Sequence, residues 1–78
     1  MLISGVVVAC LPEHIPSVSE AVNALEWAEV HHTDPKGKLV VTVEAADADA
    51  SSTCIQILQD LPHVTMAAMA EFLDEEKV

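Results

Sequence analysis

The residues of this chain that could bind a metal or act as nucleophiles are two cysteines and four histidines. Cys10 and His14 stand four residues apart, a spacing that could serve a soft metal ion. However, Cys10 ends a predicted strand, His14 begins a predicted helix, and no second pair of ligands completes the site. His31 and His32 are neighbours in a predicted strand, where successive side chains point to opposite faces. We therefore expect no bound metal and no other cofactor.

The sequence also lacks the patterns of a catalytic site. Its two glycines, Gly5 and Gly37, are far apart, so no glycine-rich phosphate loop exists. Neither a Ser–His–Asp nor a Cys–His arrangement can be built from the pattern. Cys10 and Cys54 both stand in apolar surroundings and are expected to be reduced, buried core residues, because two cysteines do not make a disulfide framework. The sequence predicts a protein that is not an enzyme.

Composition and charge restrict the class of partner. The chain has 78 residues, of which 51% are hydrophobic, enough for the core of one small domain. Thirteen acidic residues face three lysines and no arginine, which gives a formal net charge of −10. This balance excludes a nucleic-acid binder, since phosphates are neutralised by Lys and Arg. It also disfavours anionic membranes, so we expect a basic partner.

The N-terminal segment bears on location. Residues 1–11 form an uncharged and mostly apolar run. The run is too short to span a bilayer and lacks the positive n-region of a signal peptide. We therefore expect a buried first strand, a cytoplasmic protein and no insertion into a membrane.

Hydrophobic periodicity predicts six elements in the order β-α-β-β-α-β. The expected strands cover residues 3–10, 28–33, 38–44 and 64–72, and a turn at 34–37 joins the second to the third. The expected helices cover residues 13–25 and a segment that opens with Asp47 or Asp49 as N-cap and runs through Leu61. Residues 64–72 are rich in Ala and Met and would suit a helix by propensity. We predict a strand there because the sheet would otherwise keep an unpaired strand.

This order of elements is the split βαβ, or ferredoxin-like, arrangement of the α+β class. It predicts a four-stranded antiparallel sheet in the spatial order 4-1-3-2, with both helices on one face. We expect a single domain over residues 1–73 and an acidic tail over residues 74–78. The other face of the sheet is left open, and an open sheet face with few charges is a platform for a partner.

Alternation along the strands assigns side chains to the open face. Leu39, Val41 and Val43 are the stronger apolar set of their strand and should face the helices. The open face, our candidate binding site, should then present Gly5, Val7, Ala9, Val40, Thr42, Glu44, Ala68 and Ala70.

The same topology gathers most acidic residues at one end of the sheet. This acidic end should hold Glu26, Glu29, Glu44, Asp47, Asp49, Glu71, Asp74, Glu75 and Glu76. Lys36 and Lys38 should lie at the opposite end. A bland interpretation is that the acids only keep a small hydrophobic domain in solution.

Several segments carry a resemblance to the NapD family, small cytoplasmic chaperones of the periplasmic nitrate reductase. They are Gly5-Val6-Val7-Val8, Glu13-His14-Ile15, residues 29–44 and Leu61-Pro62-His63-Val64. The resemblance spans about Ser4 to Phe72. Where family members often carry Pro-Gly before the second strand, this chain has Glu26-Trp27.

The resemblance implies a function. NapD-like proteins bind the twin-arginine signal peptide of the nitrate reductase catalytic subunit and are thought to hold back export until its cofactors are installed. Such a peptide has a basic n-region and an apolar h-region, which match an acidic end and an open sheet face; it could dock as an amphipathic helix. Two alternatives stay open. One is an ACT-like small-molecule regulatory domain, although its usual glycine-containing loop after the first strand is absent here. The other is a generic assembly adaptor that uses the open face.

Overall fold

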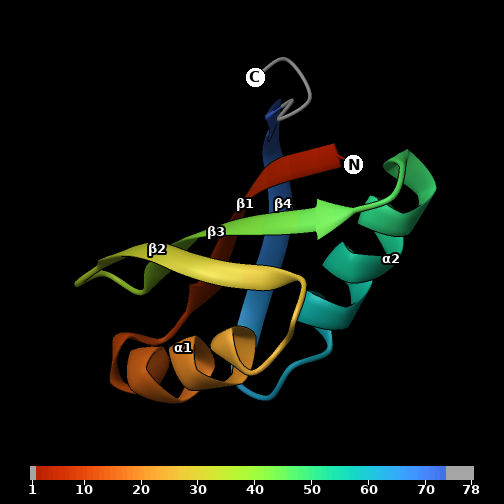
Figure 1. The fold of residues 1–78 in the computed structure, drawn as a ribbon. Helices are drawn as coiled ribbons and strands as arrows, with labels where there is room; N and C mark the ends of the chain where they lie inside the picture. Colours follow the sequence, from red (N-terminus) through yellow and green to blue (C-terminus); the bar gives the residue numbers. More distant parts are fainter. Residues whose placement is uncertain (1, 74–78) are drawn as a thin grey trace.

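The computed structural model describes residues 2–73, and among these the side chains of residues 2–70. All six predicted elements are present with the predicted types (Figure 1). They are β1 (Leu2–Cys10), α1 (Ile15–Asn23), β2 (Ala28–Asp34), β3 (Lys38–Ala45), α2 (Ala48–Gln59) and β4 (Val64–Leu73). The first helix begins later than predicted, because a 3-10 turn over Pro12–His14 precedes it. The second ends at Gln59 and not at Leu61. The expected tail, residues 74–78, lies outside the described residues.

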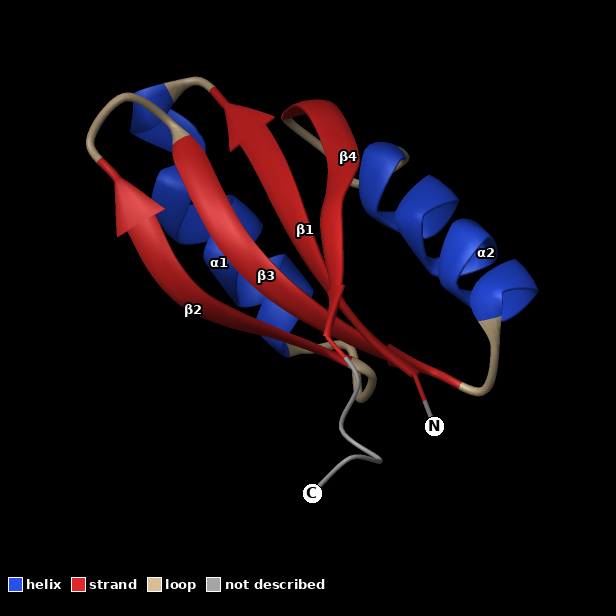
Figure 2. Ribbon diagram, turned by 90° about the horizontal axis from the view of Figure 1, so that it is seen from above, coloured by secondary structure: helices blue, strands red, loops and turns tan. Residues whose placement is uncertain are grey.

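The four strands form one antiparallel sheet in the order β2-β3-β1-β4, which confirms the predicted ferredoxin-like topology. Helix α1 packs on β2 and β3, and α2 packs on β4, β3 and β1. Figure 2 shows both helices on the same side of the sheet. In the described part of the chain, no helix has the length and apolar character needed to cross a membrane.

The core lies between the sheet and the two helices and is aliphatic. Leu39, Val41 and Val43 of β3 have no exposed surface, whereas Val40 is 44% exposed. The predicted orientation of β3 is therefore confirmed. In the described part, the other apolar side chains with at most 1% exposure are Val6, Val8, Val18, Val22 and Leu58. Each such side chain contributes about 1.5–3 kcal/mol when removed from water.

The start of α2 is set by Asp47, one of the two predicted N-cap residues. The Asp47 carboxylate accepts a hydrogen bond of 2.9 Å from the backbone N–H of Ala50. This contact satisfies one of the amide groups that the first helical turn leaves without a partner. It also fixes the point where the chain leaves β3 and turns onto the covered face.

Strand β2 contains an irregularity that the sequence pattern did not predict. Val30 pairs with Val41, and His32 pairs with the next residue of β3, Val40, so His31 is the extra residue of a β-bulge. The His31 Nε2 atom lies 2.8 Å from Oγ1 of Thr42, and His32 is opposite Val40; both of these β3 residues are on the open face. The prediction that the two imidazoles point to opposite faces is therefore wrong.

Candidate functional site

The open face of the sheet consists of rows of side chains that run across the strands. The central row, in strand order, is His32, Val40, Val7 and Ala68. On one side of it lies a row that includes Lys38, Ala9 and Met66, and on the other a row that includes Glu29, Thr42 and Gly5. The middle of the face is thus small and aliphatic, and the charged side chains that the structure describes on it, Glu29, Lys38 and Glu44, belong to β2 and β3.

Most of the predicted site residues occupy the predicted face. Val40 and Ala68 are exposed, Glu44 is exposed, and Val7, Ala9 and Thr42 are half-buried. Ala70 is exposed, but it falls at a shift of register between β1 and β4, so no residue of β1 lies directly opposite it.

Gly5 is the exception among these residues. It pairs with Thr42 on the open side, yet it is buried. The register therefore places Gly5 on the predicted face, but as a glycine in a central strand it offers little surface there. Sequence reasoning missed Met66, which pairs with Ala9 and is 45% exposed. Alternation back from Ala68 would have included it.

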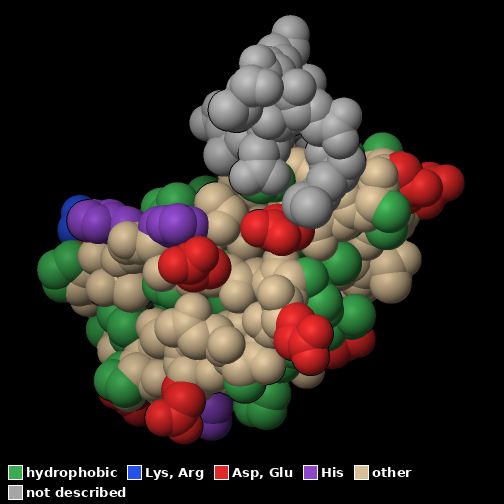
Figure 3. Space-filling view, viewed as in Figure 1, with side chains coloured by type: hydrophobic (Ala, Val, Ile, Leu, Met, Phe, Trp, Pro, Cys, Tyr) green, Lys and Arg blue, Asp and Glu red, His purple; other side chains and the backbone are tan. Residues whose placement is uncertain are grey.

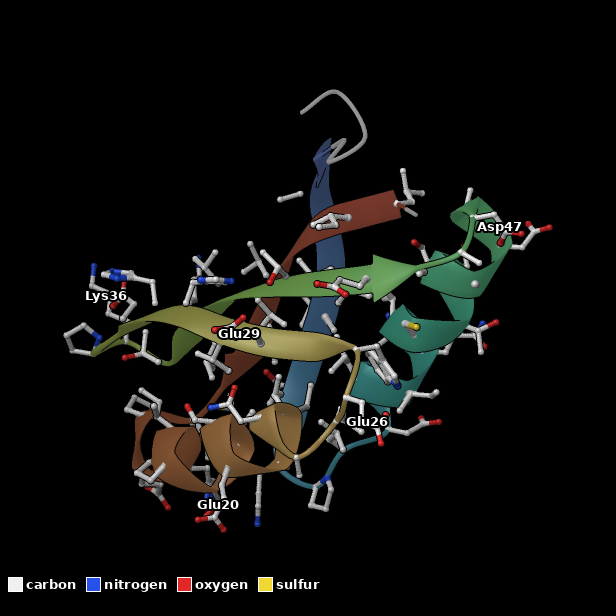
Figure 4. The ribbon with its side chains drawn as sticks, in the orientation of Figure 1. Glu20, Glu26, Glu29, Lys36 and Asp47 are labelled. Carbon is white, nitrogen blue, oxygen red and sulfur yellow. The ribbon has the colours of Figure 1, made fainter. Side chains whose placement is uncertain are left out.

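Charge is distributed unevenly over the molecule. Figure 4 shows Asp47 and Glu26 on the side of α2 and Lys36 at the far tip of the β2–β3 hairpin. In Figure 3, histidine side chains lie beside the lysine, while acidic side chains spread over the rest of the visible surface. The Oε1 atom of Glu29 lies 3.9 Å from the Nε2 atom of His31. The side chain of Glu71 and the residues Asp74, Glu75 and Glu76 of the predicted acidic end lie outside the described part.

A hollow of about 610 Å³, largely open to solvent, lies near this acidic end, where the connection before β2, the end of β3 and the connection to α2 meet. Its lining residues are Glu26, Trp27, Glu44, Ala45 and Ala46. A smaller hollow of about 70 Å³ shares the first three of these and adds Ala28, Glu29 and Thr42. Of the predicted site, only Glu44 and Thr42 line these hollows. Trp27 was missed, although a lone tryptophan beside a glutamate in an aliphatic chain was a visible signal.

The two cysteines are free thiols with different exposure. Cys10 is buried, as predicted, whereas Cys54 is only half-buried against the core. Burial raises the pKa of both thiols above the ordinary value, which lowers the fraction of reactive thiolate. His14 stacks on His63, with ring centroids 3.8 Å apart. Among the side chains that the structure describes, no three His, Cys, Asp or Glu groups are gathered to hold a metal ion.

Comparison with known proteins adds an independent line of evidence. The family model described as "NapD protein" matches residues 1–72. The solution structure of the E. coli Tat proofreading chaperone protein NapD superposes with a TM-score of 0.82 at 28% sequence identity, and the match covers 97% of this chain and 81% of that chain. None of the curated proteins matches. The family match extends over nearly the whole chain and agrees with the strand order and the helix placement described above. The chain belongs to the NapD protein family.

Proposed function

We propose that this chain is a cytoplasmic proofreading chaperone that binds the twin-arginine signal peptide of the periplasmic nitrate reductase catalytic subunit. By occupying the signal peptide it restrains export until the cofactors of the enzyme are inserted. The observation that carries the proposal is the sheet face that neither helix of the described chain covers, on a member of the NapD family, with a small aliphatic middle and carboxylates at one end. The chain acts by binding and not by catalysis.

The middle of the face suits the apolar h-region of such a peptide. Val40, Val7 and Ala68 lie side by side across three strands. Because these side chains are short, a helix can approach the sheet closely and bury its apolar stripe against them. Removal of apolar surface from water contributes about 25 cal/mol for each Å² buried. The peptide is therefore expected to bind as an amphipathic helix that lies on the sheet.

The first test is calorimetric titration of the full chain with a synthetic twin-arginine signal peptide. The Val40→Glu variant places a charge in the central row and should weaken binding about tenfold or more, because a carboxylate would have to be desolvated under the h-region. Ser52→Glu adds the same charge to the exposed surface of α2 and should leave affinity unchanged. Circular dichroism checks that both variants are folded. Equal affinity of wild type and Val40→Glu would refute docking on this face.

The second test concerns the identity of the client. The chain, tagged and expressed in its native host, should retain the nitrate reductase catalytic subunit. The same subunit without its signal peptide should not be retained. If the truncated subunit binds equally well, the chain recognises the folded enzyme and the signal peptide is not its ligand.

A further inference from the structure

The hollow beside the open face combines an aromatic wall with two carboxylates. Trp27 is half-buried, packs against the core cluster and lines the hollow. Glu26 and Glu44, both exposed, line the same hollow. Ala45 and Ala46 complete the wall with methyl groups, so most of the surface inside is apolar. A ligand for this hollow needs a flat cationic group on an aliphatic stem.

Arginine fits this description better than lysine. The guanidinium group is planar, stacks on an aromatic face and donates hydrogen bonds to two carboxylates at once. It is also weakly hydrated, so it loses less on entering a partly apolar hollow. An ammonium group is compact and strongly hydrated and lacks the flat face that an indole contacts. The chain itself supplies no cation here within the described part, where its two lysines, Lys36 and Lys38, stand at the hairpin end of the sheet.

Two hydrogen bonds hold the backbone of the segments that line the hollow. The N–H of Glu44 donates to the carbonyl oxygen of Trp27 at 2.8 Å, which fixes the start of β2 against the end of β3. The carboxamide of Asn23 accepts from the N–H of Val30 at 3.0 Å and ties the end of α1 to the same strand. The segment that carries Glu26 and Trp27 is therefore secured on both sides. A preorganised site loses less conformational entropy when it binds.

The hollow is continuous with the open face. The smaller hollow shares Glu26, Trp27 and Glu44 with the larger one, and its other lining residues include Glu29 and Thr42. Glu29 and Thr42 pair with each other on the open side of the sheet. A peptide whose h-region lies on the central row can thus place its n-region beside this hollow.

We propose that the hollow lined by Trp27, Glu26 and Glu44 is the binding site for one arginine side chain of the twin-arginine motif, a proposal that rests on the proposed function. The guanidinium stacks on the indole of Trp27, and the two carboxylates accept its hydrogen bonds. The hollow thereby selects arginine over lysine in the n-region of the peptide. Glu29, which lines the smaller hollow, adds to the negative potential at its mouth.

The test uses Trp27 as a built-in reporter, because it is the only tryptophan and the chain has no tyrosine. A synthetic signal peptide without aromatic fluorophores is titrated into the full chain, and tryptophan emission and calorimetry are recorded in parallel. Emission should change with the same dissociation constant that calorimetry gives. Peptides with Lys in place of each Arg, singly and together, should show one position whose replacement alone removes most of the emission change.

Variants of the hollow separate its three components. Glu26→Gln and Glu44→Gln should each weaken binding about fivefold, and Trp27→Leu, which keeps an apolar side chain but removes the aromatic face, should do so by a similar factor. Glu20→Gln makes the same charge change on α1, on the covered side of the sheet, and should have no effect (Figure 4). Circular dichroism and urea unfolding establish that each variant is folded.

The outcomes distinguish this inference from the proposed function. If calorimetry shows tight binding while Trp27 emission and the affinities of all three hollow variants stay unchanged, the hollow is not the arginine site and the chaperone function stands. If the twin-arginine peptide does not bind the wild-type chain in calorimetry, both proposals fail.

Discussion

Gly37 is the residue on which the β2–β3 hairpin most depends. Its φ angle is +108°, a conformation that side chains with a Cβ atom rarely adopt. A Cβ atom at this position would also collide with the carbonyl oxygen of Cys10. The Gly37 carbonyl accepts a 2.8 Å hydrogen bond from the N–H of Cys10, so the turn is tied to the end of β1. The close approach of two backbones, together with the positive φ, explains why only glycine fits.

Gly37→Ala is expected to lower the free energy of unfolding by at least about 1–3 kcal/mol, the cost of a strained backbone conformation. The backbone collision with Cys10 adds to this cost, because backbone atoms cannot rotate away as a side chain would. Urea unfolding followed by circular dichroism measures the change. Lys36→Ala, in the same turn but exposed, keeps the hydrogen bond that the backbone N–H of this residue donates to the Asp34 carboxylate, and it serves as the control. Equal unfolding midpoints for the two variants would contradict the argument.

The buried thiol of Cys10 should lower the free energy of unfolding at alkaline pH. Burial raises the pKa of its thiol above the ordinary value of 9.0, so the folded chain holds this proton at pH values where the unfolded chain releases it. The contribution of this thiol to the free energy of unfolding is therefore fully present below pH 9, and it is lost as pH rises above that value. Urea unfolding of the reduced chain should show this decline between about pH 7.5 and about pH 10.5, a range that spans the ordinary thiol pKa. Cys10→Ala should show a shallower decline; an identical pH dependence in wild type and variant would assign the effect to other groups.

At the scale of the element, the N-cap of α2 is the contact most open to a clean test. The Asp47 carboxylate accepts from the Ala50 N–H, whereas Asp49 is an exposed residue of the first turn, where its charge is favourable beside the positive end of the helix. Asp47→Ala should therefore cost about 1 kcal/mol of stability, and Asp49→Ala a few tenths of that amount. The difference between the two unfolding free energies in urea is the measurement. A larger loss from Asp49→Ala would show that charge, and not the hydrogen bond, stabilises this end.

The elements also show what a sequence can and cannot predict. β4 was predicted as a strand despite the helix propensity of its residues, because the sheet would otherwise have kept an unpaired strand. The structure confirms this prediction, since β4 pairs with β1. The bulge at His31 was not predictable in this way, since the residues that follow it, 31–34, are all polar and no apolar side chain there reveals the change of phase. Its effect is local but relevant to function. It places His32, as well as His31, on the open face and so changes the polar border of the candidate site.

At the scale of the whole molecule, the open face was predictable and the hollow was not. The face follows from alternation within single strands, so the burial of Leu39 and the exposure of Val40 could both be deduced. The hollow forms where the start of β2 meets the end of β3 and the approach to α2, and no periodic pattern reports on such a junction. Its key residue, Trp27, lies in the connection between α1 and β2. Only the three-dimensional placement shows that Trp27 and Glu44 share one site.

Separation of charge along the molecule predicts how affinity for a basic peptide should respond to salt. Glu44 follows Lys38 by six residues along β3, which places them about 20 Å apart at roughly 3.3 Å per residue. This is more than twice the Debye length of about 8 Å at physiological ionic strength, so the lysine tip and the acidic end act independently. If carboxylates at the acidic end bind the n-region, raising NaCl from about 0.05 M to about 0.5 M should weaken binding about tenfold, since each exposed ion pair contributes about 0–1 kcal/mol and is screened. Lys36→Gln should leave affinity nearly unchanged at both salt concentrations, while Glu44→Gln should flatten the salt dependence. Calorimetric affinities that are the same at both concentrations would mean that recognition depends on the apolar face and the h-region alone, with the acids serving only to keep the chain in solution.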